Sequence, residues 1–141
     1  MGQRRQAREL ALQALYQIEM LQSPPEEVLP LFWKGEFAAE QGNASDLQMF
    51  TNNLVQGTFQ HRKEIDQLIE ESATHWKLSR MAVVDRNILR MAVYELLYGK
   101  DIPVNVTLNE AIEIAKCFGT EDSGSFINGI LDKVSKEMPR K

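Results

Sequence analysis

Apolar residues recur at intervals of three and four along most of this chain, and no segment alternates apolar and polar residues as a strand does. The first such stripe begins at Ala7 and continues to Leu21, which is the pattern of a helix buried along one face. The same period returns in every later segment. The sequence therefore predicts an all-α fold with about seven helices.

Turn and capping residues divide the first half of the chain. The turn at residues 23–25 ends the first helix, and a second helix should run from there to residues 41–42, with Phe32 and Phe37 in its apolar stripe. Ser45 and Asp46 suit the start of a third helix. Its stripe continues to Ser72, so we expect one long helix over this segment.

The second half contains the densest apolar stretch, VVDRNILRMAVYELLYG at residues 83–99. Apolar residues surround nearly the whole of this helix, so it should be the central, mostly enclosed element of its lobe. Gly99 and Gly119 are the expected C-caps of this helix and the next. The expected inward residues of that next helix are Leu108, Ala111, Ile112, Ala115 and Phe118. We predict two small helical lobes, 1–75 and 76–141, which together make one compact domain.

The composition argues against several classes of protein. Cys117 is the one cysteine in 141 residues, so it cannot form an intrachain disulfide, and we expect a buried thiol in a cytoplasmic protein. No stretch reaches the ~18 apolar residues of a membrane span, and no apolar run follows Met1 as in a secretory signal. A net charge of −4 argues against a nonspecific nucleic-acid coat.

Catalytic and metal-binding patterns have little support. His61 and His75 lack the Glu-x-x-His spacing of a helical di-metal site. Glu110 and Glu113 share a helix face, but no histidine or glycine-rich loop accompanies them, so a solvated face or pairing with Arg86 and Arg90 is the simpler interpretation. We predict no catalytic residue, no metal and no cofactor.

The basic start of the chain has two interpretations. Arg4, Arg5 and Arg8 lie near the positive end of a helix dipole, which is unfavourable by a few tenths of a kcal/mol. Phosphate would compensate, because the arginine fork matches phosphate oxygens and basic ends can bind RNA. The alternative is an unstructured tip that only keeps the chain in solution.

The segment FGTEDSGSF, residues 118–126, also has two interpretations. Thr120 to Ser123 are ordinary helix-start residues, and Phe126 would then be a core residue. However, the buried face of this last helix is already supplied by other apolar residues, so Phe126 could reach an exposed edge. An exposed aromatic ring near arginines stacks unpaired RNA bases.

Three segments resemble the NusB family of transcription antitermination factors: RRQARELALQALYQ, VDRNILRMAVYELLYGKDIP and LNEAIEIAKCFGTEDSGSFINGILDK. The family fold is all-helical with two lobes, which agrees with the periodicity. The resemblance implies that the chain pairs with the ribosomal protein NusE and binds the boxA element of nascent RNA. The complex would help RNA polymerase to read through terminators, notably in ribosomal RNA operons. Some relatives form a homodimer that buries the RNA-binding start.

The resemblance also implies roles for individual residues. Its RNA-contacting positions correspond to Arg4, Arg5, Arg8, Asp122 and Phe126. Its positions facing NusE correspond to Tyr16 and Asp85. The alternative function is a purely protein-binding helical adaptor that makes no RNA contacts of its own. NusB-like domains also occur fused to RNA methyltransferases, but a chain that ends at Lys141 leaves no room for the nucleotide-fold domain of such an enzyme.

Overall fold

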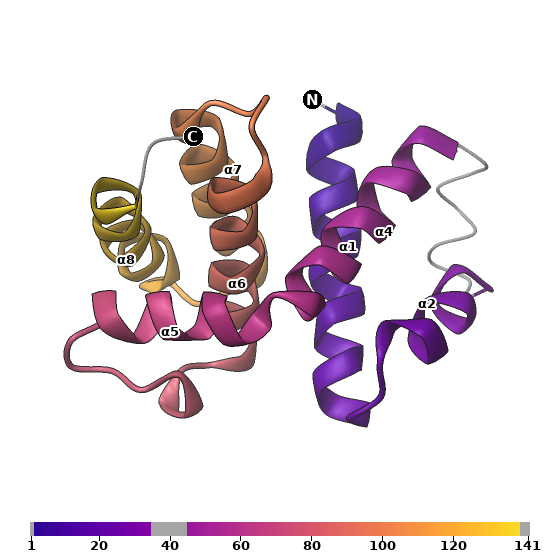
Figure 1. Cartoon of the computed structure of the whole chain (residues 1–141), viewed down its shortest axis with the longest axis horizontal. Helices are drawn as coiled ribbons and strands as arrows, with labels where there is room; N and C mark the ends of the chain where they lie inside the picture. Colours follow the sequence, from indigo (N-terminus) through magenta and orange to yellow (C-terminus); the bar gives the residue numbers. More distant parts are fainter. Residues whose placement is uncertain (1, 35–44, 139–141) are drawn as a thin grey trace. The chain divides into compact units, whose positions relative to one another are not determined.

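The computed structural model describes residues 2–34 and 45–138, and no strand occurs among them. Figure 1 shows their helical elements. These are α1 (Gly2–Leu21), α2 (Pro25–Lys34), α4 (Ser45–Gln60), α5 (Arg62–Ser72), the short 3-10 helix η1 (Leu78–Arg80), α6 (Val83–Tyr98), α7 (Val104–Phe118) and α8 (Ser123–Glu137). The predicted all-α fold is confirmed. The expected end of the second helix at residues 41–42, and Phe37, lie outside the described residues.

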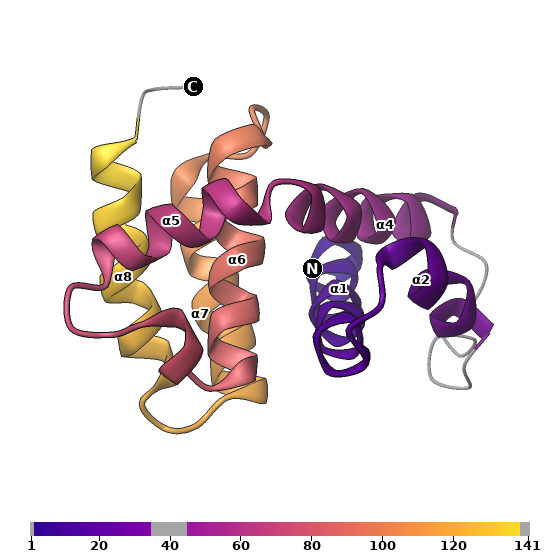
Figure 2. The ribbon, with the colours of Figure 1, turned by 60° about the horizontal axis from the view of Figure 1, so that its bottom comes forward.

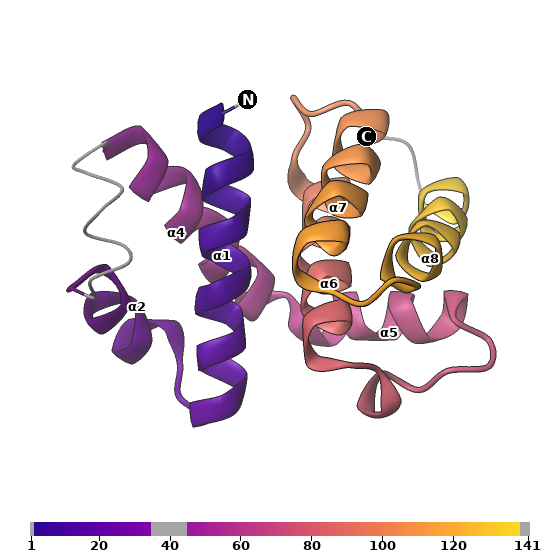
Figure 3. The same cartoon turned by 180° about the vertical axis from the view of Figure 1, so that it is seen from behind.

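The chain divides into two compact units, Met1–Gln60 and His61–Lys141. In the first unit α1 packs along α4, and α2 contacts both (Figure 3). Leu10 and Ala11 of α1 and Leu54 and Val55 of α4 are buried. Leu10, Ala11 and Leu54 lie in the apolar stripes that the period predicts, and Val55 is buried beside them.

In the second unit α6 is the central helix and contacts α5, α7 and α8 (Figure 2). Ile88, Leu89, Val93 and Leu96 have no exposed surface. The helix therefore has apolar contacts around most of its circumference, as the dense apolar stretch predicts.

The expected single helix from Ser45 to Ser72 is wrong, because His61 separates α4 from α5. His61 has φ −102° and ψ 20°, outside the helical values, so the backbone changes direction there. The stripe of α4 packs on α1, whereas Ile65 and Ile69 lie in a helix that packs on α6 and α8. The division between the two compact units lies between Gln60 and His61, whereas the sequence pattern predicted it after residue 75.

The inward face of α7 also differs from the expected one. Its buried residues are Thr107, Ala111, Ile114 and Ala115. The hydroxyl of Thr107 donates a hydrogen bond of 2.9 Å to the carboxylate of Glu95, which is buried in α6. Phe118 is the last residue of α7 and is exposed. The neighbouring Cys117 is exposed as well, contrary to the expected buried thiol.

Gly99 and Gly119 do follow the last residues of α6 and α7, as predicted. Their φ values of −86° and −99° are not left-handed, so the usual reason for a C-cap glycine does not apply. Glycine is found at these two positions because there is no room for a side chain. A Cβ atom at Gly99 would lie 2.8 Å from the carbonyl oxygen of Glu95, and one at Gly119 would overlap the side chain of Ser123.

Candidate RNA and partner surfaces

The basic start belongs to α1, which already begins at Gly2. Arg4 and Arg8 lie four residues apart and therefore on one face of the helix. Their guanidinium carbons lie 4.3 Å and 5.5 Å from the centre of the Phe50 ring. Arg4 is exposed and Arg5 is partly exposed, whereas Arg8 is only 4 % exposed. The three arginines thus differ in how far they can reach a ligand.

Phe50 is a member of this surface that the sequence did not single out. It lies in the apolar stripe of α4, where a core role is the default, yet it is partly exposed beneath the two guanidinium groups. A groove of about 350 Å³ runs beside it. The groove is lined by Gln3, Arg4, Asp46, Leu47, Met49, Phe50 and Asn53. The two guanidinium groups and the Phe50 ring together place positive charge and a flat apolar face at one position on the surface.

The turn before α8 is held by the side chain of Ser123, which is 1 % exposed. Its Oγ accepts a hydrogen bond of 2.9 Å from the backbone N–H of Thr120 and donates one of 2.7 Å to Oδ1 of Asp85. Asp122, the residue before the helix, is exposed. The sequence pattern predicted a helix start here, and the structure adds that the turn is tied to α6.

Phe126 lies one turn into α8 and is partly exposed. Its ring meets that of Trp76 edge to face, with the ring centres 5.7 Å apart and the planes at 80°. Trp76 is 51 % exposed. Phe126 is therefore not enclosed in the core, and it belongs to a surface pair whose second ring the sequence did not point to.

Asp85 lies in the first turn of α6 and is partly exposed. The residue that precedes this helix is Ala82, which has no side-chain cap. The carboxylate of Asp85 accepts its hydrogen bond from Ser123, so it links the start of α6 to the start of α8.

Tyr16 lies on α1 and is 44 % exposed. Met20, one turn later on the same face, and Leu21 are also exposed. We call these three residues the α1 apolar patch. An exposed group of large apolar side chains is typical of a protein contact surface.

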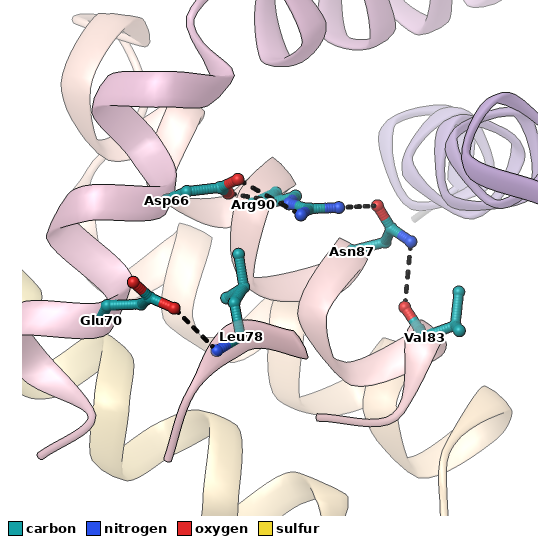
Figure 4. A network of polar contacts seen from close by, with 6 residues as sticks. All are labelled: Asp66, Glu70, Leu78, Val83, Asn87 and Arg90. Carbon is teal, nitrogen blue, oxygen red and sulfur yellow. Dashed lines mark hydrogen bonds and ion pairs between the residues drawn. The ribbon is translucent and has the colours of Figure 1, made fainter. Parts of the chain in front are cut away.

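Polar contacts connect α5 to η1 and to α6 in the second unit (Figure 4). Arg90 forms two hydrogen bonds with the carboxylate of Asp66, at 2.8 Å and 3.3 Å, and a third of 3.3 Å with Oδ1 of Asn87. The sequence had offered Glu113 as a partner for Arg90, but Glu113 pairs with Lys116 at 3.2 Å. The bonds between Arg90 and Asp66 join α6 to α5, residues that no sequence spacing relates, whereas Asn87 and Arg90 lie one turn apart on α6.

An aromatic cluster joins α6 to the start of α5. The His61 ring stacks on Tyr98 with centres 4.4 Å apart, and Tyr94 lies beside both. The hydroxyl of Tyr98 donates a hydrogen bond of 2.8 Å to Glu64. This bond, with smaller effects of burial and of the negative charge of Glu64, raises the pKa of Tyr98 above its ordinary value of 10.0.

The described residues offer neither a metal site nor a membrane-spanning helix. No group of three or more His, Cys, Asp or Glu side chains in residues 2–34 and 45–138 is arranged to hold a metal ion. None of the helices in those segments is both long and apolar enough to cross a bilayer.

Comparison with known proteins places this fold in a family. Residues 5–136 match the NusB family. The transcription antitermination protein NusB of Desulforapulum autotrophicum is 51 % identical over 134 residues, which are 95 % of this chain and 92 % of that protein.

Solved structures agree with the sequence match. A NusB structure from T. maritima has a TM-score of 0.82 and 41 % identity, and it covers 95 % of this chain and 91 % of that one. The NusB chain in a crystal structure of the antitermination factors NusB and NusE in complex with dsRNA has a TM-score of 0.85 and 27 % identity, covering 98 % and 99 %. The helical period, the central apolar helix and the near-complete matches agree, and this chain belongs to the NusB family.

Proposed function

We propose that this chain is a transcription antitermination factor that pairs with the ribosomal protein NusE and binds boxA RNA of nascent transcripts. The observation that carries the proposal is the match to transcription antitermination proteins at 51 % identity over 95 % of the chain. A homologous NusB, 27 % identical, occurs in a solved complex with NusE and dsRNA. The proposed result is read-through in ribosomal RNA operons.

The RNA contacts are proposed to come from both units. Arg4 and Arg5 provide exposed or partly exposed positive charge on α1, and Arg8 supports Arg4 across the Phe50 ring. In the second unit Phe126 offers a partly exposed ring for base stacking, and Asp122 offers an exposed carboxylate that can accept hydrogen bonds from base edges. These side chains combine phosphate binding with stacking, as single-stranded RNA requires.

The NusE contacts are proposed at Tyr16 and Asp85. Tyr16 belongs to the α1 apolar patch, whose side chains would be covered by a partner. Asp85 keeps one carboxylate oxygen on Ser123, and its partly exposed side chain adds negative charge for a basic partner.

The chain would act in the cytoplasm as a non-enzymatic member of the RNA polymerase antitermination complex, without a cofactor. A homodimer that covers the basic start would be its alternative to RNA binding. The competing function is a protein-binding adaptor whose arginines never meet RNA, and the exposed α1 apolar patch is the observation that favours it.

The deciding experiment is a titration of labelled boxA RNA with the chain and NusE at several salt concentrations. We expect steep weakening with salt, because Lys and Arg release counterions from phosphate. Changing Arg4 and Arg5 together to Ala should flatten the salt slope by about 0.7 per lost contact. A scrambled RNA is the matched control.

The adaptor function predicts a different result. NusE would bind with the same affinity in the double variant and in the native chain, and labelled boxA RNA would show no salt-dependent binding to either complex. That outcome would contradict the proposed RNA-binding function.

A further inference from the structure

The segment between α5 and α6 is held in place by contacts with the interior of the second unit. Leu78 and Met81 are 6 % and 5 % exposed and anchor it in the core. The backbone N–H of Leu78 donates a hydrogen bond of 3.0 Å to the carboxylate of Glu70 (Figure 4). The N–H of Trp76 donates one of 3.0 Å to the carbonyl oxygen of Ala73. Side chains that point outward from this segment are therefore held in place before any ligand arrives.

Trp76 is the outward side chain that most needs an explanation. Tryptophan is usually well buried on average, yet this ring is 51 % exposed. Its contact with Phe126 is edge to face at 80°. In an edge-to-face contact, one of the two rings contributes only its edge. Both faces of that ring remain available for stacking on a base. Two rings at a right angle also form a corner into which a flat base fits.

The segment that contains Trp76 is basic, although the carboxylate of Glu70 accepts a hydrogen bond from its backbone at Leu78. Residues 75–80 read His-Trp-Lys-Leu-Ser-Arg and contain no acidic residue. Lys77 and Arg80 are exposed on either side of the buried Leu78. A basic segment around an exposed ring is typical of single-strand nucleic-acid binding, in which bases stack and cations follow the backbone.

Space beside Phe126 is open as well. Gly129 lies one turn further along α8 and is exposed, and a Cβ atom added there would meet nothing within 4 Å. A glycine inside a helix is destabilising relative to alanine, so the helix itself does not require a glycine at this position. The surface at Gly129, one turn from Phe126, is therefore open.

We propose that Trp76 and Phe126 form a two-ring platform for an unpaired RNA nucleotide, and that Lys77 and Arg80 bind the adjoining phosphates. This inference rests on the proposed function, because it extends the RNA surface of the second unit beyond Asp122 and Phe126. The base of this nucleotide stacks on Trp76, next to the base that stacks on Phe126. The contacts of Lys77 and Arg80 with phosphate make RNA binding depend more steeply on salt.

The test compares Trp76 variants in the complex with NusE, titrated with labelled boxA RNA. Trp76→Ala should weaken RNA binding between several-fold and about a hundredfold, the usual value of one stacked base. Trp76→Tyr should keep most of the affinity, because any flat ring can stack. Lys77→Ala with Arg80→Ala should flatten the salt slope by about 0.7 per contact. Urea unfolding of each variant gives the affinity per folded molecule.

Trp33 supplies the matched control, because the chain has two tryptophans and Trp33 donates a hydrogen bond to Asn52 in the other unit. Trp33→Phe should bind RNA normally and leave Trp76 as the chain's one indole. Stacking should then quench its fluorescence when boxA RNA is added to the NusE complex. The double variant Trp33→Phe/Trp76→Phe gives the background signal from NusE.

The possible failures are distinguishable. If Trp76→Ala binds RNA like the native chain while the Arg4/Arg5 double variant does not, the platform is wrong and the proposed function stands. If Trp76→Ala loses NusE and keeps RNA affinity, the ring contacts protein and the platform is wrong. If the native chain with NusE does not bind boxA RNA at all, both proposals are wrong.

Discussion

Arg4 and Arg8 lie over the same Phe50 ring, but they should behave differently when changed. Arg8 is 4 % exposed, so its stem packs against neighbours and its charge interacts with the ring away from water. Arg8→Ala should lower the free energy of unfolding by about 1 to 2 kcal/mol. Arg4→Ala should cost less than about 1 kcal/mol and mainly weaken RNA binding. Urea unfolding and RNA titration of both variants measure this, and the reverse order of stabilities would contradict it.

Two glycines of the second unit should respond in opposite ways to alanine. At Gly119 a Cβ atom would overlap the Ser123 side chain and lie 2.9 Å from the carbonyl oxygen of Ala115. Gly119→Ala should therefore destabilise the chain by about 1 to 3 kcal/mol, as overpacking does. Gly129→Ala meets no atom and should stabilise α8 by about 0.5 to 1 kcal/mol. Thermal unfolding of the two variants is the measurement, and equal effects would disprove the steric explanation.

At the scale of the helices, Asp85 and Ser123 connect the start of α6 to the start of α8. Asp85→Asn keeps an oxygen that can accept from Ser123 but removes the charge, so we expect a nearly unchanged melting temperature and weaker NusE binding. Ser123→Ala removes the donor to Asp85 and the acceptor for Thr120, and should cost about 1 to 3 kcal/mol. Calorimetry with NusE that gives full affinity for Asp85→Asn would restrict Asp85 to its structural link.

The bond between Tyr98 and Glu64 connects α6 to α5 and has a definite pH dependence. The protonated phenol is the donor, and the pKa of Tyr98 is raised in the folded chain. The stabilisation is therefore fully present below the ordinary pKa of 10.0 and is lost as the pH rises through the raised value. Glu64→Gln should lower the pKa of Tyr98, as followed by the ultraviolet absorbance of phenolate. An unchanged titration would show that Glu64 does not cause the shift.

For the whole molecule, RNA and a second copy of the chain should compete for the basic start. If a homodimer buries Arg4 and Arg5, boxA RNA can bind only the separated chains, so adding RNA should lower the dimer fraction. Light scattering over a range of chain concentrations, with and without RNA, measures this. Dimers that bind RNA without dissociating would place the dimer interface elsewhere.

The sequence determined the parts of this fold that depend on local geometry. A helix repeats every 3.6 residues, so the apolar stripes of α1, α6 and α8 could be followed in the sequence without knowledge of their partners. Gly99 and Gly119 marked helix ends correctly, but close contacts with Glu95 and Ser123, and not the backbone freedom that the prediction used, explain why glycine stands there. The family could also be identified, because long segments of its pattern are present.

The tertiary structure decided which faces meet, and this determined the candidate site. The break at His61 was invisible because the apolar stripe continues through it, while α4 and α5 pack on different helices. Arg8 is buried, with its guanidinium group over the Phe50 ring, and Phe126 stays near the surface beside Trp76. These pairs are far apart in the sequence. An apolar stripe shows on which side of a helix a residue lies. Only the packing of the helices decides whether that residue meets the core, solvent or another aromatic ring.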